Sequence, residues 1–545
     1  MTPTPDPVQA LYDRIDPGGR DRFNFARDVL LPWAEAAPDD PAISFMNGDD
    51  ATSYTISHLM DRARRLAGVL HAAGVGPGDP VMILLGRHPA WWETLTACLW
   101  LGAVACPGTT QLRERDLRYR LESLPPSALI ADTALTGTVA AALRGLPTPH
   151  AMLSVGEAET GGSPAFTDIQ TALAGADPAP AANTRASDPA LCYFTSGTTG
   201  YPKRTLHGQA YGLAHLVTGR DWLGLAPGTR HWNISDTGWA KAAWSSYFAP
   251  LLMRAHLMVH PDGAFDAAHM LPLMVRHRVA SLCAAPTVYR MLIQEDSAAL
   301  AGHSLTSCVS AGEPLNPDVI ARWHAATGIT IRDGYGQTET ALLAGTFPGM
   351  TPAPGSMGRP APGVDLAIVD DAGTPLNAGA EGHIALRVKP DRPRGLFLEY
   401  QDDPDQTASR FHGDWYFTGD RGTRDRHGIF WFKSRADDVI LSSGYRIGPF
   451  EVESALQEHP LVAESAVVSS PDAERGEVVT AYVVLTPGHE GSDALAAVLQ
   501  AHVKAVTAPY KYPRRIRFVA SLPKTVSGKI RRVDLRRREW NRNRH

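Results

Sequence analysis

Short apolar runs of strand length alternate with longer helical patterns along the first two thirds of the chain. The apolar runs cover residues 81–85, 128–131, 192–195, 256–260, 281–285 and 308–311. Residues 89–103 start with a proline in the first turn and predict a helix. Strands separated by helices predict parallel β–α–β units and an α/β fold, with residues 177–188 as a connector.

The pattern changes after residue 360 or so. Residues 365–376, 382–388 and 428–434 predict strands that are joined by glycine-containing turns. From about residue 435 onwards, a helix over 449–459 is combined with strands over 466–470 and 478–485. The pattern therefore predicts a large α/β region, a β-rich subdomain and a small α+β region.

Composition and charge exclude several classes of protein. Of 545 residues, 52 are Lys or Arg and 57 are Asp or Glu, which gives a net charge of −5. A general nucleic-acid binder should be basic, so this balance argues against one. The hydrophobic share of 44% allows several cores. The 49 glycines and 43 prolines are fewer than low-complexity chains contain, so collagen, a coiled coil and wholesale disorder are excluded.

Cysteine usage and apolar segments predict the compartment. The five cysteines are an odd number without CxxC spacing, as expected for buried thiols in a reducing compartment. The N-terminus has no apolar region typical of a secretory signal. The most apolar stretch, residues 95–106, is too short to span a bilayer. We expect a soluble, cytoplasmic protein.

The stretch 193–203 carries the most informative chemistry. A predicted strand enters a run of hydroxyl residues and glycines that ends in a lysine, the composition of a polyphosphate cradle. It is not a Walker A loop, because Pro202 precedes the lysine and Arg204 follows it. The alternative is an ordinary Ser/Thr/Gly surface loop. The cradle residues are Thr195, Ser196, Gly197, Thr198, Thr199, Gly200 and Lys203.

Six motifs in order resemble those of the adenylate-forming superfamily, which includes acyl-CoA synthetases, adenylation domains and luciferases. They are TSGTTGYPK (195–203), AGEPL (311–315), DGYGQTET (333–340), YFTGDRG (416–422), residues 434–453 and PKTVSGKIRR (523–532). Residues 23–30, 89–92, 107–112 and 235–240 resemble medium-chain acyl-CoA synthetases most closely. The resemblance implies an AMP-binding adenylation domain over 1–436 and a mobile C-terminal domain over 437–545.

The resemblance also implies roles for individual residues in nucleotide binding. Lys529 is the expected catalytic lysine of adenylation, Thr338 contacts the α-phosphate, and Glu339 is both catalytic and the Mg²⁺ ligand. Capping of a helix is the alternative role for Thr338. The remaining ATP or AMP contacts implied are Gly312, Glu313, Pro314, Asp333, Gly334, Tyr335, Gly336, Gln337, Asp420 at the ribose, Arg435 and Arg446, in addition to the phosphate loop.

A second implied set concerns CoA, the acyl group and movement. The CoA contacts are Gln111, Ser443, Gly444, Tyr445, Arg475, Tyr512 and Arg514, and the hinge is Asp437. Trp239 is expected to line the acyl pocket, although a core tryptophan is the alternative. Gly336 replaces the tryptophan of acetate-activating relatives, so the pocket floor is expected to be open. This predicts an acid longer than propionate and leaves linear and aryl acids undecided.

The leading hypothesis is an ATP-dependent medium-chain or aryl acyl-CoA synthetase that forms an acyl-adenylate and releases AMP and pyrophosphate. ATP, Mg²⁺ and CoA are the implied cofactors and co-substrates. The alternative is an adenylation enzyme that loads a carrier protein; homodimer formation is left open, and neither a nucleic acid nor a membrane span is expected. A catalytically silent binding protein is disfavoured because Lys203, Glu339, Asp420 and Lys529 are all present.

Overall fold

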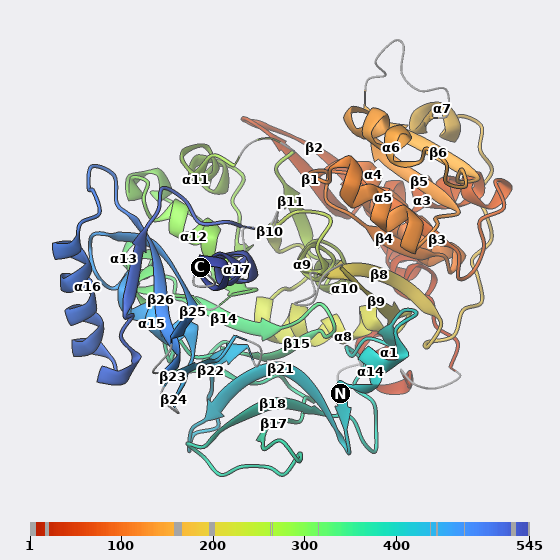
Figure 1. Cartoon of the computed structure of the whole chain (residues 1–545). Coiled ribbons are helices and arrows are strands. Elements are labelled where there is room, and N and C mark those ends of the chain that lie inside the picture. The colour runs from red at the N-terminus through yellow and green to blue at the C-terminus, as the bar shows by residue number, and fades with distance from the viewer. Residues whose placement is uncertain are drawn as a thin grey trace, which may run out of the picture.

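The described chain forms four β-sheets flanked by helices (Figure 1). The computed structural model describes residues 7–16, 21–156, 166–195, 202–261, 263, 265–313, 315–435, 438–442, 445–472, 475–524 and 530–542. None of the helices in these ranges has both the length and the apolar character needed to cross a bilayer.

The first sheet has the order β19-β9-β8-β4-β3-β5-β6-β7. Its inner strands pair in parallel, as the alternating pattern predicts, but β8 and β9 are antiparallel because the predicted phosphate loop joins them directly. The strands are β3 (Pro80–Leu84), β4 (Val104–Pro107), β5 (Ala128–Asp132), β6 (Ala151–Val155), β7 (Thr167–Asp168), β8 (Pro189–Thr195), β9 (Lys203–Gly208) and β19 (Glu399–Tyr400).

The second sheet has the order β16-β15-β14-β13-β12-β10-β11-β1-β2 and is parallel from β14 to β1. Its strands are β1 (Pro41–Asn47), β2 (Asp50–Thr55), β10 (Arg230–Ile234), β11 (His256–Val259), β12 (Ser281–Ala284), β13 (Ser307–Ala311), β14 (Ile331–Gly336), β15 (Leu342–Gly345) and β16 (Arg359–Pro360). The carboxyl ends of its parallel strands carry the segments that contain Gly312 and Gln337.

Two smaller antiparallel-rich sheets follow. The β-rich subdomain holds β17 (Leu366–Val369), β18 (Glu381–Arg387), β20 (Phe411–His412), β21 (Trp415–Arg424) and β22 (Phe430–Arg435). The C-terminal sheet holds β23 (Ile440–Ser442), β24 (Tyr445–Ile447), β25 (Val462–Asp472), β26 (Gly476–Leu485) and β27 (Arg515–Phe518). The predicted boundary at 436/437 lies between β22 and β23, outside the described residues.

Local sequence signals set the helix ends. Helix α4 (Pro89–Leu101) starts with a proline at its first position, is capped by the His88 ring at Ala90 N (3.2 Å), and ends at Gly102, whose φ of 70° favours glycine. The other main helices are α1 (Pro7–Arg14), α3 (Ile56–Ala72), α5 (Glu114–Ser123), α8 (Tyr211–Val217), α9 (Ala240–Ala243), α11 (Ala267–Arg276), α12 (Pro286–Leu292), α13 (Pro317–Thr327), α15 (Pro449–Gln457), α16 (Asp493–Val506) and α17 (Arg532–Arg542).

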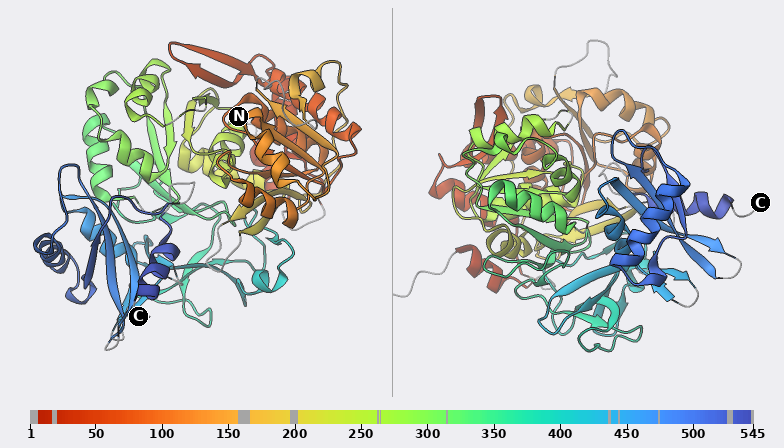
Figure 2. Two further views of the ribbon diagram at one scale, coloured as in Figure 1. Left: turned by 45° about the horizontal axis from the view of Figure 1, so that its top comes forward. Right: turned by 90° about the vertical axis from the view of Figure 1, so that its left-hand side faces the viewer.

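The C-terminal region lies against the second sheet and the β-rich subdomain. In Figures 1 and 2 the blue C-terminal sheet and α16 sit beside the green helices α12 and α13, whereas the orange first sheet lies on the opposite side of the molecule. Asn316 at the start of α13 donates a 3.4 Å hydrogen bond to Gln457 at the end of α15. The two regions therefore meet through polar side chains next to the segment that follows β13.

Candidate active site

The stem of the predicted phosphate loop is a β-hairpin. Thr195 at the end of β8 pairs with Lys203 at the start of β9, so the strands hold the two ends of the loop side by side. Ser196, Gly197, Thr198, Thr199 and Gly200 lie outside the described residues. Tyr119 of α5 donates a 3.1 Å hydrogen bond to the carbonyl of Pro202, which ties the loop end to the first sheet's helices.

Lys203 and Glu339 face one another across a buried tyrosine. The Lys203 ammonium lies 5.0 Å from the centre of the Tyr400 ring, and the Tyr400 hydroxyl donates a 2.7 Å hydrogen bond to Glu339 Oε1. Burial lowers the pKa of Lys203, and the nearby Arg410 lowers it further, whereas Glu339 acts in the opposite direction. The structure thus places the predicted phosphate lysine and the predicted metal carboxylate within electrostatic reach of each other.

Thr338 is held by a histidine that the sequence motifs do not include. The Nε2–H of His207, on β9, donates to the Thr338 carbonyl at 2.7 Å. Burial lowers the pKa of His207 to about 3, so the ring is neutral and its Nδ1 carries no proton. The strand after the phosphate loop therefore fixes the backbone of the segment that supplies Thr338 and Glu339.

Asp420 is the centre of a buried polar cluster. The side chain is 4% exposed and its Oδ2 accepts from the Tyr335 hydroxyl (2.6 Å) and from Gln337 Nε2 (2.7 Å). Arg435 pairs with Asp420 in the β21–β22 ladder, and its Nε lies 3.2 Å from Oδ1. Burial raises the pKa of Asp420, and Arg435, Tyr335 and Gln337 counteract that rise. These contacts bring the predicted ribose residues Asp420 and Arg435 together with two residues of the 333–340 motif.

Asp420→Asn is expected to weaken ATP binding about tenfold and to lower the free energy of unfolding by about 1–3 kcal/mol. The amide replaces one acceptor oxygen with an NH₂ donor. Its single remaining oxygen cannot accept from Tyr335 and Gln337 on one side and also face the Arg435 cation on the other. Titration calorimetry with ATP and urea denaturation measure the two effects. Asp414→Asn, which removes a carboxylate that is 55% exposed, is the control. Equal ATP affinities for the two variants would contradict the ribose assignment.

The residues of the predicted adenine wall lie in the segment that follows β13 and within β14. Glu313 accepts from Thr287 Oγ1 (3.0 Å) and from Arg290 Nη2 (2.8 Å), so α12 holds this segment; Pro314 lies outside the described residues. Burial raises the pKa of Asp333 to about 7, opposed by backbone N–H donors and by Lys241. Gly334 of β14 donates to Asp333 at 3.0 Å. Lys241, which the motifs do not include, donates to the Ala311 carbonyl at 2.9 Å.

The expectation of open space beside Gly336 is wrong. A Cβ atom at this position would lie 2.5 Å from Cη2 of Trp244 and 2.6 Å from the carbonyl of Ala341. Trp244 is buried and its Nε1 donates a 2.6 Å hydrogen bond to the Tyr211 hydroxyl. A tryptophan from a distant segment occupies the position that a side chain of residue 336 would take, so the glycine accommodates Trp244. Trp239 is half-buried at the start of α9, and its buried Nε1 makes no hydrogen bond to any residue that the structure describes.

The predicted CoA residues lie on two separate parts of the chain. Gln111 is exposed on the loop after β4, and its N–H donates to Thr109 Oγ1 at 3.3 Å. In the C-terminal region, Arg514 donates to the Tyr512 hydroxyl (2.8 Å), and Tyr445 is exposed and stacked on Tyr510 at 4.3 Å. The Arg475 N–H donates to Asp472; Ser443, Gly444 and the Arg446 side chain lie outside what the structure describes. Among the described residues, no hydrogen bond joins Gln111 to this C-terminal set.

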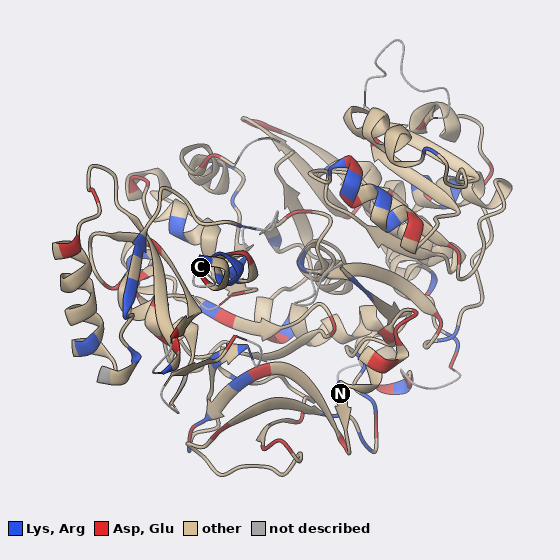
Figure 3. Ribbon diagram, viewed as in Figure 1, with Lys and Arg blue, Asp and Glu red and all other residues tan. Residues whose placement is uncertain are grey.

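The residues that flank the predicted hinge and catalytic lysine are described, although Asp437 and Lys529 themselves are not. Asp438 forms an ion pair with Arg536 of α17. Arg532 of the same helix pairs with Glu453 of α15 at 2.6 Å. Figure 3 shows this concentration of basic residues on α17. One ion pair therefore joins the basic tail to the residue that follows the predicted hinge, and a second joins it to α15.

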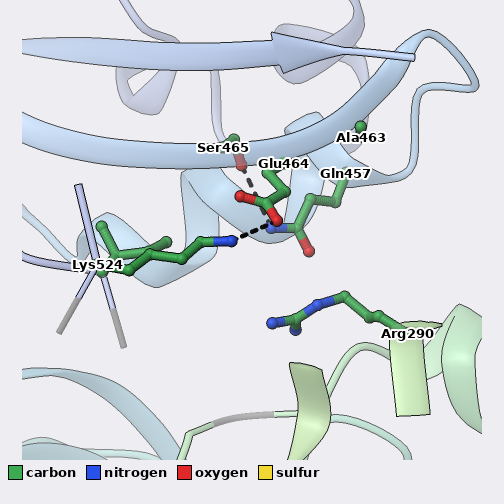
Figure 4. A pocket seen from close by; sticks show the side chains of 7 residues that line it. Arg290, Gln457, Ala463, Glu464, Ser465 and Lys524 are labelled. Carbon is green, nitrogen blue, oxygen red and sulfur yellow. Dashed lines mark hydrogen bonds and ion pairs between the residues drawn. The ribbon is translucent and has the colours of Figure 1, made fainter. Parts of the chain in front are cut away.

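A small pocket lies at the junction of the two regions (Figure 4). Arg290 of α12 points toward Gln457 and Glu464 of the C-terminal region, and Lys524 pairs with Glu464 at 2.6 Å. The same arginine binds Glu313 of the predicted adenine wall. Most of the residues that line it are polar or charged, as is common where two parts of a chain meet through an interface that can separate.

The residues at Glu339 fit a magnesium ion. Mg²⁺ is usually bound by one or two carboxylates together with substrate phosphates and water. Oε1 of Glu339 accepts from Tyr400, and among the described residues no donor contacts Oε2. Within the described ranges no group of three or more His, Cys, Asp or Glu side chains is arranged to hold a metal. Among the described residues, the Glu339 carboxylate, next to the predicted phosphate lysine, is thus the candidate ligand for the metal.

The chain matches two family models. Residues 31–394 match the AMP-binding enzyme family and residues 451–529 match the AMP-binding enzyme C-terminal domain. It is 46% identical to human acyl-coenzyme A synthetase ACSM3 over 528 residues, which cover 95% of this chain and 90% of that protein. It is 44% identical to rat acyl-coenzyme A synthetase ACSM5 over 557 residues, which cover 99% of this chain and 96% of that protein.

Solved structures of related enzymes have the same fold. The anthranilate CoA ligase AuaEII in complex with anthranoyl-AMP superposes with a TM-score of 0.86 at 29% identity, covering 95% of this chain and 97% of that one. A benzoate CoA ligase from Burkholderia xenovorans LB400 superposes with a TM-score of 0.83 at 28% identity, covering 94% and 100%.

The expectation of a cytoplasmic enzyme is contradicted by these relatives. ACSM3, ACSM4 and ACSM5 are all mitochondrial proteins. The expectation depended on the lack of an apolar secretory segment. Such a lack carries no information on mitochondrial import, because import sequences are amphipathic and arginine-rich.

Proposed function

Since the chain belongs to the AMP-binding enzyme family, as an ATP-dependent acyl-CoA synthetase of the medium-chain type, we propose that it activates a medium-chain or aryl carboxylic acid with MgATP. The observation that carries this proposal is the 46% identity to ACSM3 across 95% of the chain. The clustering of Lys203, Glu339 and Asp420 around one site supports it, because these residues carry the charges that the first half-reaction needs.

In the first half-reaction a carboxylate oxygen attacks the α-phosphorus of ATP, the bond to the bridging oxygen breaks, and pyrophosphate leaves. Negative charge on the phosphoryl oxygens must be stabilised. We assign Lys203 to the terminal phosphates, Asp420 to the ribose hydroxyls and Lys529 to the α-phosphate and the attacking carboxylate. Glu339 would hold Mg²⁺, which would neutralise further charge on the phosphates.

In the second half-reaction the CoA thiolate attacks the acyl carbon and AMP leaves, which gives the thioester. One site can serve both steps only if part of the protein moves. We assign the movement to rotation of residues 437–545 about Asp437. Rotation would deliver Tyr445 and its neighbours to the site where Lys529 acted in the first step.

The test is CoA-dependent release of AMP with ATP and Mg²⁺ across acids from acetate to dodecanoate, together with benzoate and anthranilate. We expect a maximum at intermediate chain length or at an aryl acid, and little AMP when CoA is omitted. A maximum at acetate would contradict the proposed substrate class. Exchange of pyrophosphate without CoA-dependent turnover would contradict the second half-reaction and favour a carrier-protein thiol instead.

A further inference from the structure

Tyr400 connects the two oppositely charged residues of the phosphate site. Its hydroxyl donates to Glu339 Oε1 at 2.7 Å, and the Lys203 ammonium lies over its ring, 5.0 Å from the centre. The residue is 1% exposed, so both contacts are shielded from water. None of the sequence motifs includes this tyrosine, because it lies some 60 residues after Glu339 and almost 200 after Lys203 in the chain.

A short edge strand explains why the tyrosine is fixed in this position. Strand β19 pairs with β9 so that Tyr400 lies opposite Thr205, two residues after Lys203. Hydrogen bonds from Leu398 N to Leu206 O (2.6 Å) and from Gln401 N to Arg204 O (2.8 Å) continue the pairing on both sides. The position of the tyrosine is therefore set by the strand that begins with the phosphate lysine.

The same segment also holds the backbone of Glu339. The N–H of Phe397 donates to the Glu339 carbonyl at 2.8 Å, and the Phe397 ring packs against Tyr400 at 4.8 Å. Residues 397–400 consequently fix both the main chain and one carboxylate oxygen of Glu339. A carboxylate held at one oxygen presents the other in a defined direction, which is what a metal ligand requires.

Tyr400 offers a hydrogen-bond donor to the carboxylate of Glu339 and a ring face to the ammonium of Lys203. The carboxylate can only accept, so the Tyr400 hydroxyl is the donor of the 2.7 Å hydrogen bond to Glu339. The electron-rich ring face attracts the ammonium of Lys203, which burial has partly desolvated. One side chain thus satisfies a carboxylate through its hydroxyl and a cation through its ring, and it separates the two so that they do not form a direct ion pair.

We propose that Tyr400 is a positioning residue for the adenylation step, which orients Glu339 toward the metal and Lys203 toward the phosphates. This inference rests on the proposed function, because it takes Glu339 as the metal ligand and Lys203 as a phosphate ligand. Tyr400 touches neither substrate nor metal in this role. It lies between the carboxylate and the ammonium and keeps them apart, so that each can interact with MgATP.

Two variants of Tyr400 separate its two contacts. Tyr400→Phe removes the hydroxyl and keeps the ring, so we expect about tenfold weaker binding of the metal and an ATP affinity close to that of the parent when metal is saturating. Tyr400→Leu removes both contacts, so we expect weaker binding of the metal and also weaker binding of ATP when metal is saturating. Tyr416→Phe is the matched control, since Tyr416 is buried beside Phe397 but donates to Gln337 (3.3 Å) instead of Glu339.

The measurement is Mn²⁺ binding, followed by electron paramagnetic resonance in the presence of α,β-methylene-ATP, which cannot be cleaved. It requires no turnover, and binding of AMP without metal checks that each variant is folded. An affinity of Tyr400→Phe for Mn²⁺ within twofold of the parent would overturn the inference, and so would an equal loss in Tyr416→Phe. Failure of the proposed function would show differently, as an unmodified protein that makes no AMP in the presence of CoA.

Discussion

Lys529→Ala is expected to slow acyl-adenylate formation by about 10²–10³-fold or more while ATP still binds. The step builds negative charge around the α-phosphorus and requires a cation that is placed there before the reaction. The phosphate loop supplies Lys203 for the terminal phosphates but no cation for the attacking carboxylate. Lys529 itself lies outside the described residues, whereas Lys524 and Ile530 on either side of it pair in an antiparallel bridge.

Pyrophosphate release in the absence of CoA measures this step directly. Lys524→Ala is the matched control, since it removes a nearby lysine that pairs with Glu464 on the C-terminal sheet. The Lys529 variant should still convert chemically prepared acyl-adenylate and CoA to the thioester, because its role belongs to the first half-reaction. A parental rate of pyrophosphate release from this variant would show that another group supplies the charge.

Glu339→Gln is expected to lower kcat/KM for MgATP by about 100-fold, which corresponds to the several kcal/mol that a bound metal contributes to phosphate chemistry. Glutamine still has a carbonyl oxygen for the Tyr400 hydroxyl, so the local packing should survive. The substitution removes the negative charge that we assign to binding of the metal and that opposes the effect of desolvation on the pKa of Lys203.

The dependence of the rate on Mg²⁺ concentration distinguishes loss of the metal site from general damage. The Glu339 variant should require far more Mg²⁺ for half-maximal rate, and the melting temperature should stay near that of the parent. Glu399→Gln, at the exposed neighbour of Tyr400, should behave as the parent does. An unchanged Mg²⁺ requirement in Glu339→Gln would remove this residue from the metal site.

The sequence predicts most of the strands that form the two large sheets. The apolar runs at 81–85, 128–131 and 281–285 coincide with β3, β5 and β12, because each is buried on both faces and has no competing helical period. The two-residue strand β19 is not predictable in this way. Its position depends on pairing with β9, which is almost 200 residues earlier in the chain.

The residues of the candidate site likewise fall into those that the sequence predicts and those that it does not. Residues inside contiguous motifs, such as Asp420 and Gln337, are predicted and lie together in the structure. Side chains that support them from other segments are missed, as His207, Tyr400 and Trp244 show. Gly336 is the clearest case. The glycine shows from the sequence that a side chain is absent at this position. What fills the space is decided by Trp244, which belongs to a different element.

The native cysteines are buried and should not compete with cysteines introduced for site-directed labelling. All five are free and buried. Burial raises the pKa of Cys98 and Cys308, and a hydrogen bond with Cys192 together with burial raises the pKa of Cys106. These thiols therefore react slowly with maleimides, because the thiolate is the form that attacks. Cysteines introduced at Met291 on α12 and Val498 on α16, which are 42% and 51% exposed, would therefore take up spin labels selectively. The distance between such labels reports rotation of the C-terminal region in solution without removal of any native thiol.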